Sequence, residues 1–341
     1  MVMVKLNSLL FIVLVFGCLY GAAQEISGLV LDSKTREPIT GASVYYDGSA
    51  VGTITDLDGN FQIPALLGSN AVLVIRHLGY KTRKLVPLQG KSLLRIVLSE
   101  EAESLDEIIV TADPFSRKQK LKVFRLEFLG DTKGGKNSSI VNEEDVRLFF
   151  NTYNNTLTAH SERPLIVQND YLGYRISFEI EQFKIYFKST SLKRIDNIFH
   201  TVYEGSAQFF DVASRNYKVK KRRENAYEGS RMHFMRSCWN GNLHRQNFEL
   251  RKKFKNIPTS ELFVVKNDSL EEFRNIQFLG EQFVIYHRKK GYYRSTLNIQ
   301  KPETVFSLDR YGGCTPFKEL VFGGYMADYR IGDMLPIDYG L

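Results

Sequence analysis

The feature that most constrains the fold is a succession of short apolar segments, each closed by a turn signal, between residues 24 and 103. In residues 41–63, GASVYYDGSAVGTITDLDGNFQI, these segments are separated by Asp47-Gly48 and by the DGN triplet of residues 58–60. Such pairs of Asp, Asn and Gly favour the backbone conformations of tight hairpin turns. Short strands with closely spaced turns are typical of a β-sandwich, which we predict for residues 24–103.

Three stretches of this region carry a family pattern: ISGLVLDSKTREPITGASVYYDG, VGTITDLDGNFQI and RHLGYKTRKLVPL. The pattern consists of G-x-V-x-D, E-P-x-x-G-A, G-T-x-T-D-x-x-G-x-F and a late G-Y. Its positions here are Gly28, Asp32, Glu37, Pro38, Gly41, Ala42, Gly52, Thr53, Asp56, Gly59, Phe61, Gly79 and Tyr80. The region therefore resembles the carboxypeptidase-regulatory-like domain. The resemblance implies a transthyretin/prealbumin-like β-sandwich.

Residues 1–23 are typical of a signal peptide. Lys5 gives a positive start, a continuous apolar run extends from Leu9 to Phe16, and small residues precede Gln24. We therefore predict cleavage between Ala23 and Gln24. The apolar run covers eight residues, which is short of the roughly 20 that a transmembrane helix needs. The signal peptide thus predicts export.

The cysteines leave two questions open. The VFGC stretch that ends at Cys18 loosely resembles a lipobox, although small residues before Gln24 explain the segment as an ordinary signal peptide. After cleavage Cys238 and Cys314 remain, and an exported chain could hold them as a disulfide or as two free thiols.

The formal net charge is +8. Because we expect export, this charge favours anionic lipid headgroups or acidic glycans, or simply a solvated surface, over nucleic acid.

Residues 104–114 are predicted to be a linker. Part of it resembles the TonB-box-like segment that follows the same module in TonB-dependent outer-membrane receptors. The residues of this candidate partner-contact segment are Leu105, Asp106, Glu107, Ile108, Ile109 and Val110. The segment is either a last strand that leads into the linker or a contact made by strand addition. We expect no transporter, because the sequence that follows is too short for a receptor barrel.

Residues 115–341 are predicted to form an α+β domain in which an antiparallel sheet is accompanied by one long and one short helix. Apolar and polar residues alternate over residues 174–187, as expected for antiparallel strands. Residues 215–240 predict the long helix, and Asn142 is placed to cap the short one. Residues 146–150 either extend that short helix or begin a strand.

This second region also resembles a domain that follows the same module in uncharacterised exported proteins of Gram-negative bacteria. The resembling stretches are NTLTAHSERPLIVQNDYLGYRISFEIEQF, AYEGSRMHFMRS, FVIYHR and LDRYGGCTPFKELVFGGYMADYRIGDMLPIDYGL. The resemblance implies an architecture and a compartment, which is the periplasm or the outer-membrane periphery of a Gram-negative bacterium. It implies no activity.

Motifs for chemistry are weak throughout. Residues 130–137, GDTKGGKN, have the G-x-x-x-x-G-K spacing of a P-loop, but Asn137 stands where that loop needs Ser or Thr, so we expect a solvent-exposed turn. No H-x-x-E pair is present for a zinc peptidase. His233 and Cys238 are five residues apart, a spacing that keeps side chains apart on a helix, so Cys238 is expected to be a buried apolar residue. Residues 56–59 predict a hairpin turn rather than a calcium loop.

The sequence therefore predicts an exported envelope protein that is not an enzyme, with no catalytic, cofactor-binding or metal-binding residues. Its work would be binding or assembly, with another envelope protein or a surface glycan as the partner, without nucleic acid, and with peripheral association with the outer membrane. The alternative is an envelope hydrolase whose site is assembled from distant residues of the second region. The sequence leaves the ligand and the oligomeric state open.

Overall fold

The computed structural model describes residues 24–87, 93–101, 113–193, 195–252, 255–256, 263–267, 272–288 and 293–341. These residues form a mainly β structure with an N-terminal sandwich and several antiparallel sheets, as the sequence predicts. Three hydrophobic clusters hold it together, one in the sandwich and two in the region that follows.

The sandwich consists of a three-stranded sheet in the order β4-β1-β7 and a four-stranded sheet in the order β3-β2-β5-β6. The strands are β1 (Glu25–Asp32), β2 (Ser43–Tyr46), β3 (Gly52–Ile54), β4 (Asn60–Pro64), β5 (Leu73–Arg76), β6 (Arg83–Leu85) and β7 (Leu93–Leu98). Phe61 fills the core above Gly28, where a Cβ atom would lie 2.4 Å from the Phe61 ring. Gly28 is therefore needed for this core to close. The predicted turns are present, with Gly48 and Gly59 at positive φ.

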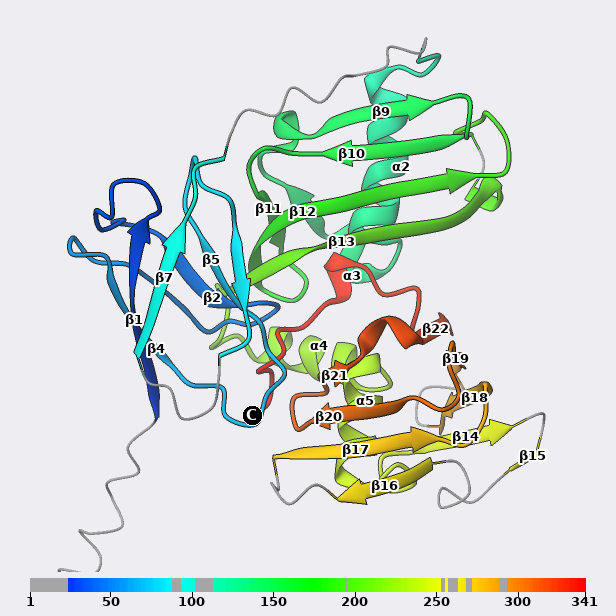
Figure 1. Ribbon diagram of the computed structural model, residues 1–341. Helices are drawn as coiled ribbons and strands as arrows, with labels where there is room; N and C mark the ends of the chain where they lie inside the picture. The colour runs from blue at the N-terminus through cyan, green and yellow to red at the C-terminus, as the bar shows by residue number, and fades with distance from the viewer. Residues whose placement is uncertain are drawn as a thin grey trace, which may run out of the picture.

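A six-stranded sheet follows, built around the 14-residue strand β12 (Tyr174–Phe187). One edge of β12 pairs with β11 (Leu165–Asn169) and β10 (Thr156–His160), and the other pairs along its length with β13 (Ile198–Asp211). The outer strands are β8 (Ser138–Ile140) and β9 (Arg147–Asn151). The helix α2 (Arg117–Leu129) covers one face of this sheet (Figure 1). There the rings of Phe124 and Phe128 lie 4.9 Å from Phe183 and 5.3 Å from Phe178, respectively.

The third cluster lies between two small antiparallel sheets and the helix α5 (Arg231–Asn240), which contributes Phe234, Met235 and Cys238. One sheet contains β14 (Phe248–Lys252), β15 (Lys255–Asn256), β18 (Gln282–His287), β19 (Tyr293–Ile299) and β22 (Leu320–Gly324). The other contains β16 (Phe263–Asn267), β17 (Phe273–Phe278), β20 (Val305–Asp309) and β21 (Cys314–Thr315).

The helices differ from expectation. The expected long helix is two helices, α4 (Tyr217–Tyr227) and α5, because Gly229 adopts φ +76° and the Ser230 side chain then caps α5 at the backbone N–H of His233. The short helix after Asn142 is a single 3-10 turn, η1 (Glu143–Asp145), and the ambiguous residues 146–150 contribute to β9. We did not predict α2 or α3 (Lys133–Lys136). Further 3-10 turns among the described residues are η2 (Ile195–Asn197), η5 (Phe317–Glu319) and η6 (Ile331–Asp333).

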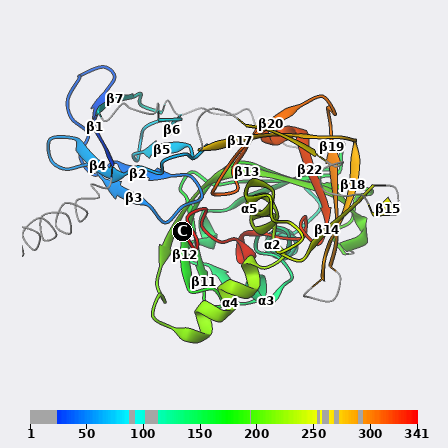
Figure 2. The ribbon, with the colours of Figure 1, turned by 90° about the horizontal axis from the view of Figure 1, so that it is seen from below.

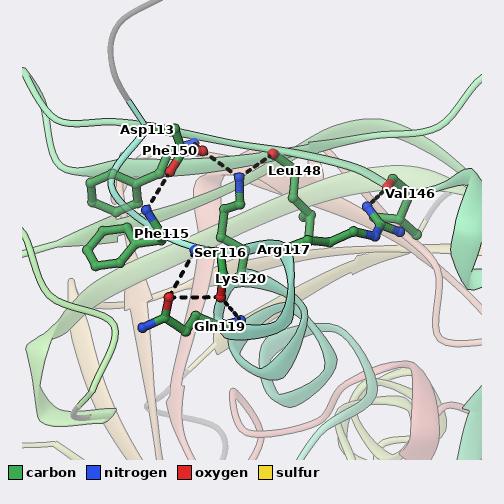
Figure 3. A network of polar contacts seen from close by, with 9 residues as sticks. All are labelled: Asp113, Phe115, Ser116, Arg117, Gln119, Lys120, Val146, Leu148 and Phe150. Atoms are coloured by element: carbon green, nitrogen blue, oxygen red, sulfur yellow. Dashed lines mark hydrogen bonds and ion pairs between the residues drawn. The ribbon is translucent and has the colours of Figure 1, made fainter.

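The start of α2 is fixed by Asp113 (Figure 3). The Asp113 carboxylate pairs with the ammonium group of Lys120 and accepts the backbone N–H groups of Phe115 (3.0 Å) and Phe150 (3.1 Å). Lys120 also donates to the carbonyl of Leu148 at 3.0 Å, so one ion pair joins the helix to β9. Burial by itself raises the pKa of Asp113, but these hydrogen bonds outweigh it and lower the pKa below its usual value.

Two further contacts complete this helix start (Figure 3). Ser116 and Gln119 form a capping box, in which the Gln119 side chain accepts the Ser116 backbone N–H at 2.9 Å. The Arg117 guanidinium donates to the carbonyl of Val146 at 2.7 Å. The helix is thus tied at its N-terminus to the strand that it covers.

A second close contact joins α3 to η6. A Cβ atom on Gly134 would lie 2.1 Å from the Gly332 carbonyl oxygen, and one on Gly332 would lie 2.5 Å from the Gly135 Cα. Residues 130–137 are only in part the solvent-exposed turn that we expected, because Gly134 and Gly135 are buried while the exposed residues are Asp131, Thr132, Lys133, Lys136 and Asn137. The absence of side chains at Gly134 and Gly135 allows residues 331–333 to pack closely against α3.

We predict that Asp113→Asn lowers the free energy of unfolding at pH 7 by about 3 kcal/mol, because it leaves Lys120 mostly buried without its counter-charge. The folded-state pKa of Asp113 is lowered, so its contribution is fully present above the unfolded value, near 3.8, and is lost as the pH falls through the folded value. The difference in unfolding free energy between the variant and wild type, measured by urea unfolding, should therefore be smaller at pH 3 than at pH 7. The control is Asp131→Asn, which removes an exposed pair with Lys136 and should change little. Equal losses in both variants would contradict this role of Asp113.

We also predict that Gly134→Ala lowers the free energy of unfolding by about 2 kcal/mol, because the added methyl group overlaps the Gly332 carbonyl. Gly134 lies in a helical turn, where alanine is otherwise the better residue by about 1 kcal/mol. The sign of the change in urea unfolding therefore tests the contact itself. The control Lys133→Ala alters an exposed residue of the same turn. A gain in stability for Gly134→Ala would show that α3 and η6 do not pack closely.

Candidate partner-binding surface

The sandwich is attached to the six-stranded sheet through the turn between β2 and β3. The backbone N–H of Gly48 donates to the Ala207 carbonyl at 2.7 Å, and that of Phe209 donates to the Ser49 carbonyl at 2.9 Å. The Asp47 carboxylate accepts the N–H of Ala207 at 2.8 Å. This turn therefore runs beside the end of β13 as a short parallel partner.

The same side of the sandwich makes polar contacts with β12. Thr82 donates to the Glu179 carboxylate at 2.8 Å, and Arg76 lies 3.6 Å from the same carboxylate. Lys84 pairs with Glu181. These contacts come from β5, β6 and the residue before β6, so the four-stranded sheet faces the rest of the molecule.

A third attachment uses the carboxylate of Asp309. It accepts the backbone N–H of Asn70 at 2.6 Å, together with those of Gly313 (2.7 Å) and Tyr311 (2.9 Å). Burial raises the pKa of this carboxyl group. The carboxylate thus joins the loop before β5 to the turn after β20.

These attachments leave the β4-β1-β7 sheet on the outside of the molecule (Figure 1). Its inner residues are buried, and the alternate positions face outward. We name the outward set the free sheet face: Ser27, Leu29, Gln62, Leu93, Arg95 and Val97. Leu93 is 75% exposed and lies on β7, an edge strand of the sheet. An apolar residue at an exposed sheet edge is a typical site of contact with another chain.

The buried nucleophile candidates serve packing. Cys238 and Cys314 are free thiols, and burial raises the pKa of Cys238 and raises that of Cys314 to about 12. Such thiols are not ionised near neutral pH and are poor nucleophiles. Burial also lowers the pKa of His233, whose Nδ1 accepts the Gly229 N–H at 3.1 Å while Nε2 contacts Gln246 at 3.0 Å. This imidazole is neutral and holds the break between α4 and α5.

Several predicted site residues lie outside the described residues. These are Cys18, Ala23 and the candidate partner-contact segment from Leu105 to Val110. The cleavage site and the strand-addition contact therefore stay predictions. Residues 56–59 form the predicted turn, with Asp56 accepting the Asn60 N–H at 2.7 Å.

The described residues hold neither a metal cluster nor a spanning helix. None of their His, Cys, Asp and Glu side chains form a group of three that could hold a metal ion. No described helix is long and apolar enough to cross a membrane.

The free sheet face was not predicted from sequence. In the sequence, Leu29 and Leu93 look like ordinary strand residues. That their sheet is the outer one is known only from the structure, in which the opposite sheet is covered. The sequence signal that could have indicated this face is Leu93, an apolar residue at a position of its strand that faces outward.

Comparison with known proteins concerns this sandwich. Residues 26–110 match the CarboxypepD_reg-like domain. Over 90 residues the chain is 40% identical to the TonB-dependent receptor SusC of Bacteroides thetaiotaomicron, a match that covers 26% of the chain and 8% of the receptor. Over 89 residues it is 34% identical to the TonB-dependent receptor P39 of Formosa agariphila, with the same coverage of 26% and 8%. The match thus spans less than a tenth of these receptors' length.

Among solved structures, a chain of a type II cohesin–X-dockerin complex from Acetivibrio cellulolyticus aligns over 23% of this chain and 58% of its own, with 22% identity and a TM-score of 0.20. A putative membrane-associated protein of unknown function from Bacteroides fragilis aligns over 88% and 96%, with 10% identity and a TM-score of 0.18. Neither similarity is close enough to carry an argument. The sequence matches and the observed sandwich agree, and residues 26–110 are a CarboxypepD_reg-like domain homologous to the N-terminal region of TonB-dependent receptors.

Proposed function

We propose that this chain is an exported, non-catalytic binding or assembly protein of the cell envelope, which presents its CarboxypepD_reg-like domain to another envelope protein. The signal-peptide pattern of residues 1–23 supports the location. The relatives of its sandwich are TonB-dependent receptors, which also supports association with the envelope.

The observation that carries the proposal is the way in which the sandwich is attached. Three separate contacts, at Asp47, Glu179 and Asp309, hold its four-stranded sheet against the second region. The opposite sheet and its edge strand β7 make none of these contacts and lie on the outside of the molecule (Figure 1). A rigidly held domain loses little entropy on binding, which favours recognition through this surface.

The chemistry of the buried polar groups supports the non-catalytic part of the proposal. Asp113, Arg223, His233 and Asp309 each bind backbone groups of neighbouring elements. Their hydrogen-bonding capacity is used to join segments of the chain. A catalytic group instead needs an atom directed at a substrate.

We predict that a photo-crosslinking amino acid placed at Leu93 in the full chain gives one discrete adduct with an envelope protein of the producing cell. The matched control position is Val141, which is 62% exposed on the second region and should give no such adduct. Adding Arg95→Glu, which inverts a charge beside the crosslinker on the same face, should reduce the adduct several-fold without changing thermal unfolding.

Equal adducts from Leu93 and Val141, or an adduct that ignores Arg95→Glu, would contradict a specific surface. Turnover of a peptide, ester or glycoside by the purified chain, abolished by a single His, Cys or acidic replacement, would contradict the non-catalytic proposal.

A further inference from the structure

The helix α4 and the segment that leads into it form a surface of unusual composition. Val212 and Tyr217 are 53% and 77% exposed. Residues 210–223 carry six cations and one acid, Asp211. We name the α4 patch by its exposed residues: Val212, Tyr217, Lys218 and Lys221.

The inner side of α4 is fixed by Arg223. This buried guanidinium donates to the Asp211 carboxylate at 2.7 and 2.8 Å and to the carbonyls of Leu172 (2.7 Å) and Gly173 (2.9 Å). It also lies 3.8 Å from the centre of the Tyr174 ring. The basic run of residues 218–223 therefore has one member in the interior. The helix cannot turn its outer side inward.

The outer side is left strongly positive. Val219 and Arg223 face inward, and Tyr217 and Lys221, one helical turn apart, project outward beside Lys218. The hydrogen bonds from Arg223 lower the pKa of Asp211, so this acid is ionised and already paired. Glu224, the next acid, stands three residues after Lys221 and four after Lys220, so it lies beside both lysines at the margin of the α4 patch and leaves the patch with an excess of positive charge.

We propose that the α4 patch docks the protein on the anionic headgroups of a membrane surface, with Tyr217 and Val212 entering the interface between headgroups and acyl chains. Lysine and arginine near an anionic bilayer are attracted to it, and exposed aromatic and apolar side chains add interfacial burial. A solvated basic surface does not need these apolar neighbours, so their presence distinguishes docking from solubility. The inference rests on the proposed envelope location.

The experiment is co-sedimentation of the full chain with vesicles of phosphatidylethanolamine and phosphatidylglycerol, compared with vesicles of phosphatidylcholine alone. We expect binding to the anionic vesicles, weakened by salt. Lys218→Gln/Lys221→Gln should reduce vesicle affinity by roughly 30-fold. The matched control, Lys81→Gln/Arg83→Gln, removes the same charge beside β6, which Figure 2 places on the other side of the molecule from α4, and should bind as wild type does.

A second readout does not depend on the charge variants. Tyr217→Trp places a reporter at an exposed position, while the native Trp239 gives a background that wild type measures. The emission of this variant should shift to the blue with anionic vesicles and stay unchanged with neutral ones.

Three results would overturn the proposal: equal binding to both kinds of vesicle, equal losses in the two double variants, or no blue shift in the Tyr217→Trp variant. Each of them would also leave an acidic protein as the better candidate for the partner of the α4 patch. Cross-linking from Leu93 detects a protein bound to the free sheet face, which is a different surface. Its outcome is therefore independent of the vesicle result.

Discussion

The arrangement of the molecule depends on one buried cation, Arg236 of α5. Its guanidinium donates to the carbonyls of Tyr311 (3.0 Å), Ile337 (2.7 Å) and Tyr339 (2.7 Å). A guanidinium presents its donors in a rigid fork, and burial without these carbonyls would be costly. The C-terminal segment therefore has a fixed path, and on that path the N–H of Ile337 donates to the Gly48 carbonyl of the sandwich at 2.7 Å. One side chain of α5, the helix that packs in the third cluster, thus holds the segment that reaches the sandwich.

The fixed path determines which surfaces remain available. Earlier in the same segment, η6 packs on α2 and α3, so residues 331–341 contact elements of all three hydrophobic clusters. The sandwich is held on its β2-β5 side, and its other sheet is left outside. In Figure 2 that sheet and α4 occupy different sides of the molecule. The free sheet face and the α4 patch are therefore two separate surfaces on one connected body.

Local patterns were enough for the sandwich and for the long strands. Turn residues at 47–48 and 58–60 and the alternation along β12 predicted these elements, because hairpins and half-buried strands are encoded by neighbouring residues. The helix α2 was missed although Ser116 and Gln119 carry its capping signal, because its buried side includes Lys120 and Glu127 and so lacks a clean apolar stripe. The break at Gly229-Ser230 was likewise present in the sequence as a stop followed by a cap.

The attachments could not be predicted in the same way. Asp47 meets Ala207 across 160 residues, and Arg236 meets Ile337 across 101. Such contacts pair a polar side chain with a backbone group, which any residue possesses, so they leave no periodic or compositional trace.

The attachments also bear on how the two proposed surfaces would act together. Two binding sites on one chain reinforce each other only to the extent that their separation is fixed, because a loose connection lowers the effective concentration of the second site. In this chain the connection is made by carboxylates and backbone groups buried between the sandwich and the second region, where Asp47 and Asp309 have pKa values raised by burial. Those same buried groups keep the free sheet face at a set position relative to α4. Asp47 and Asp309 therefore help to set the geometry between these two exposed surfaces.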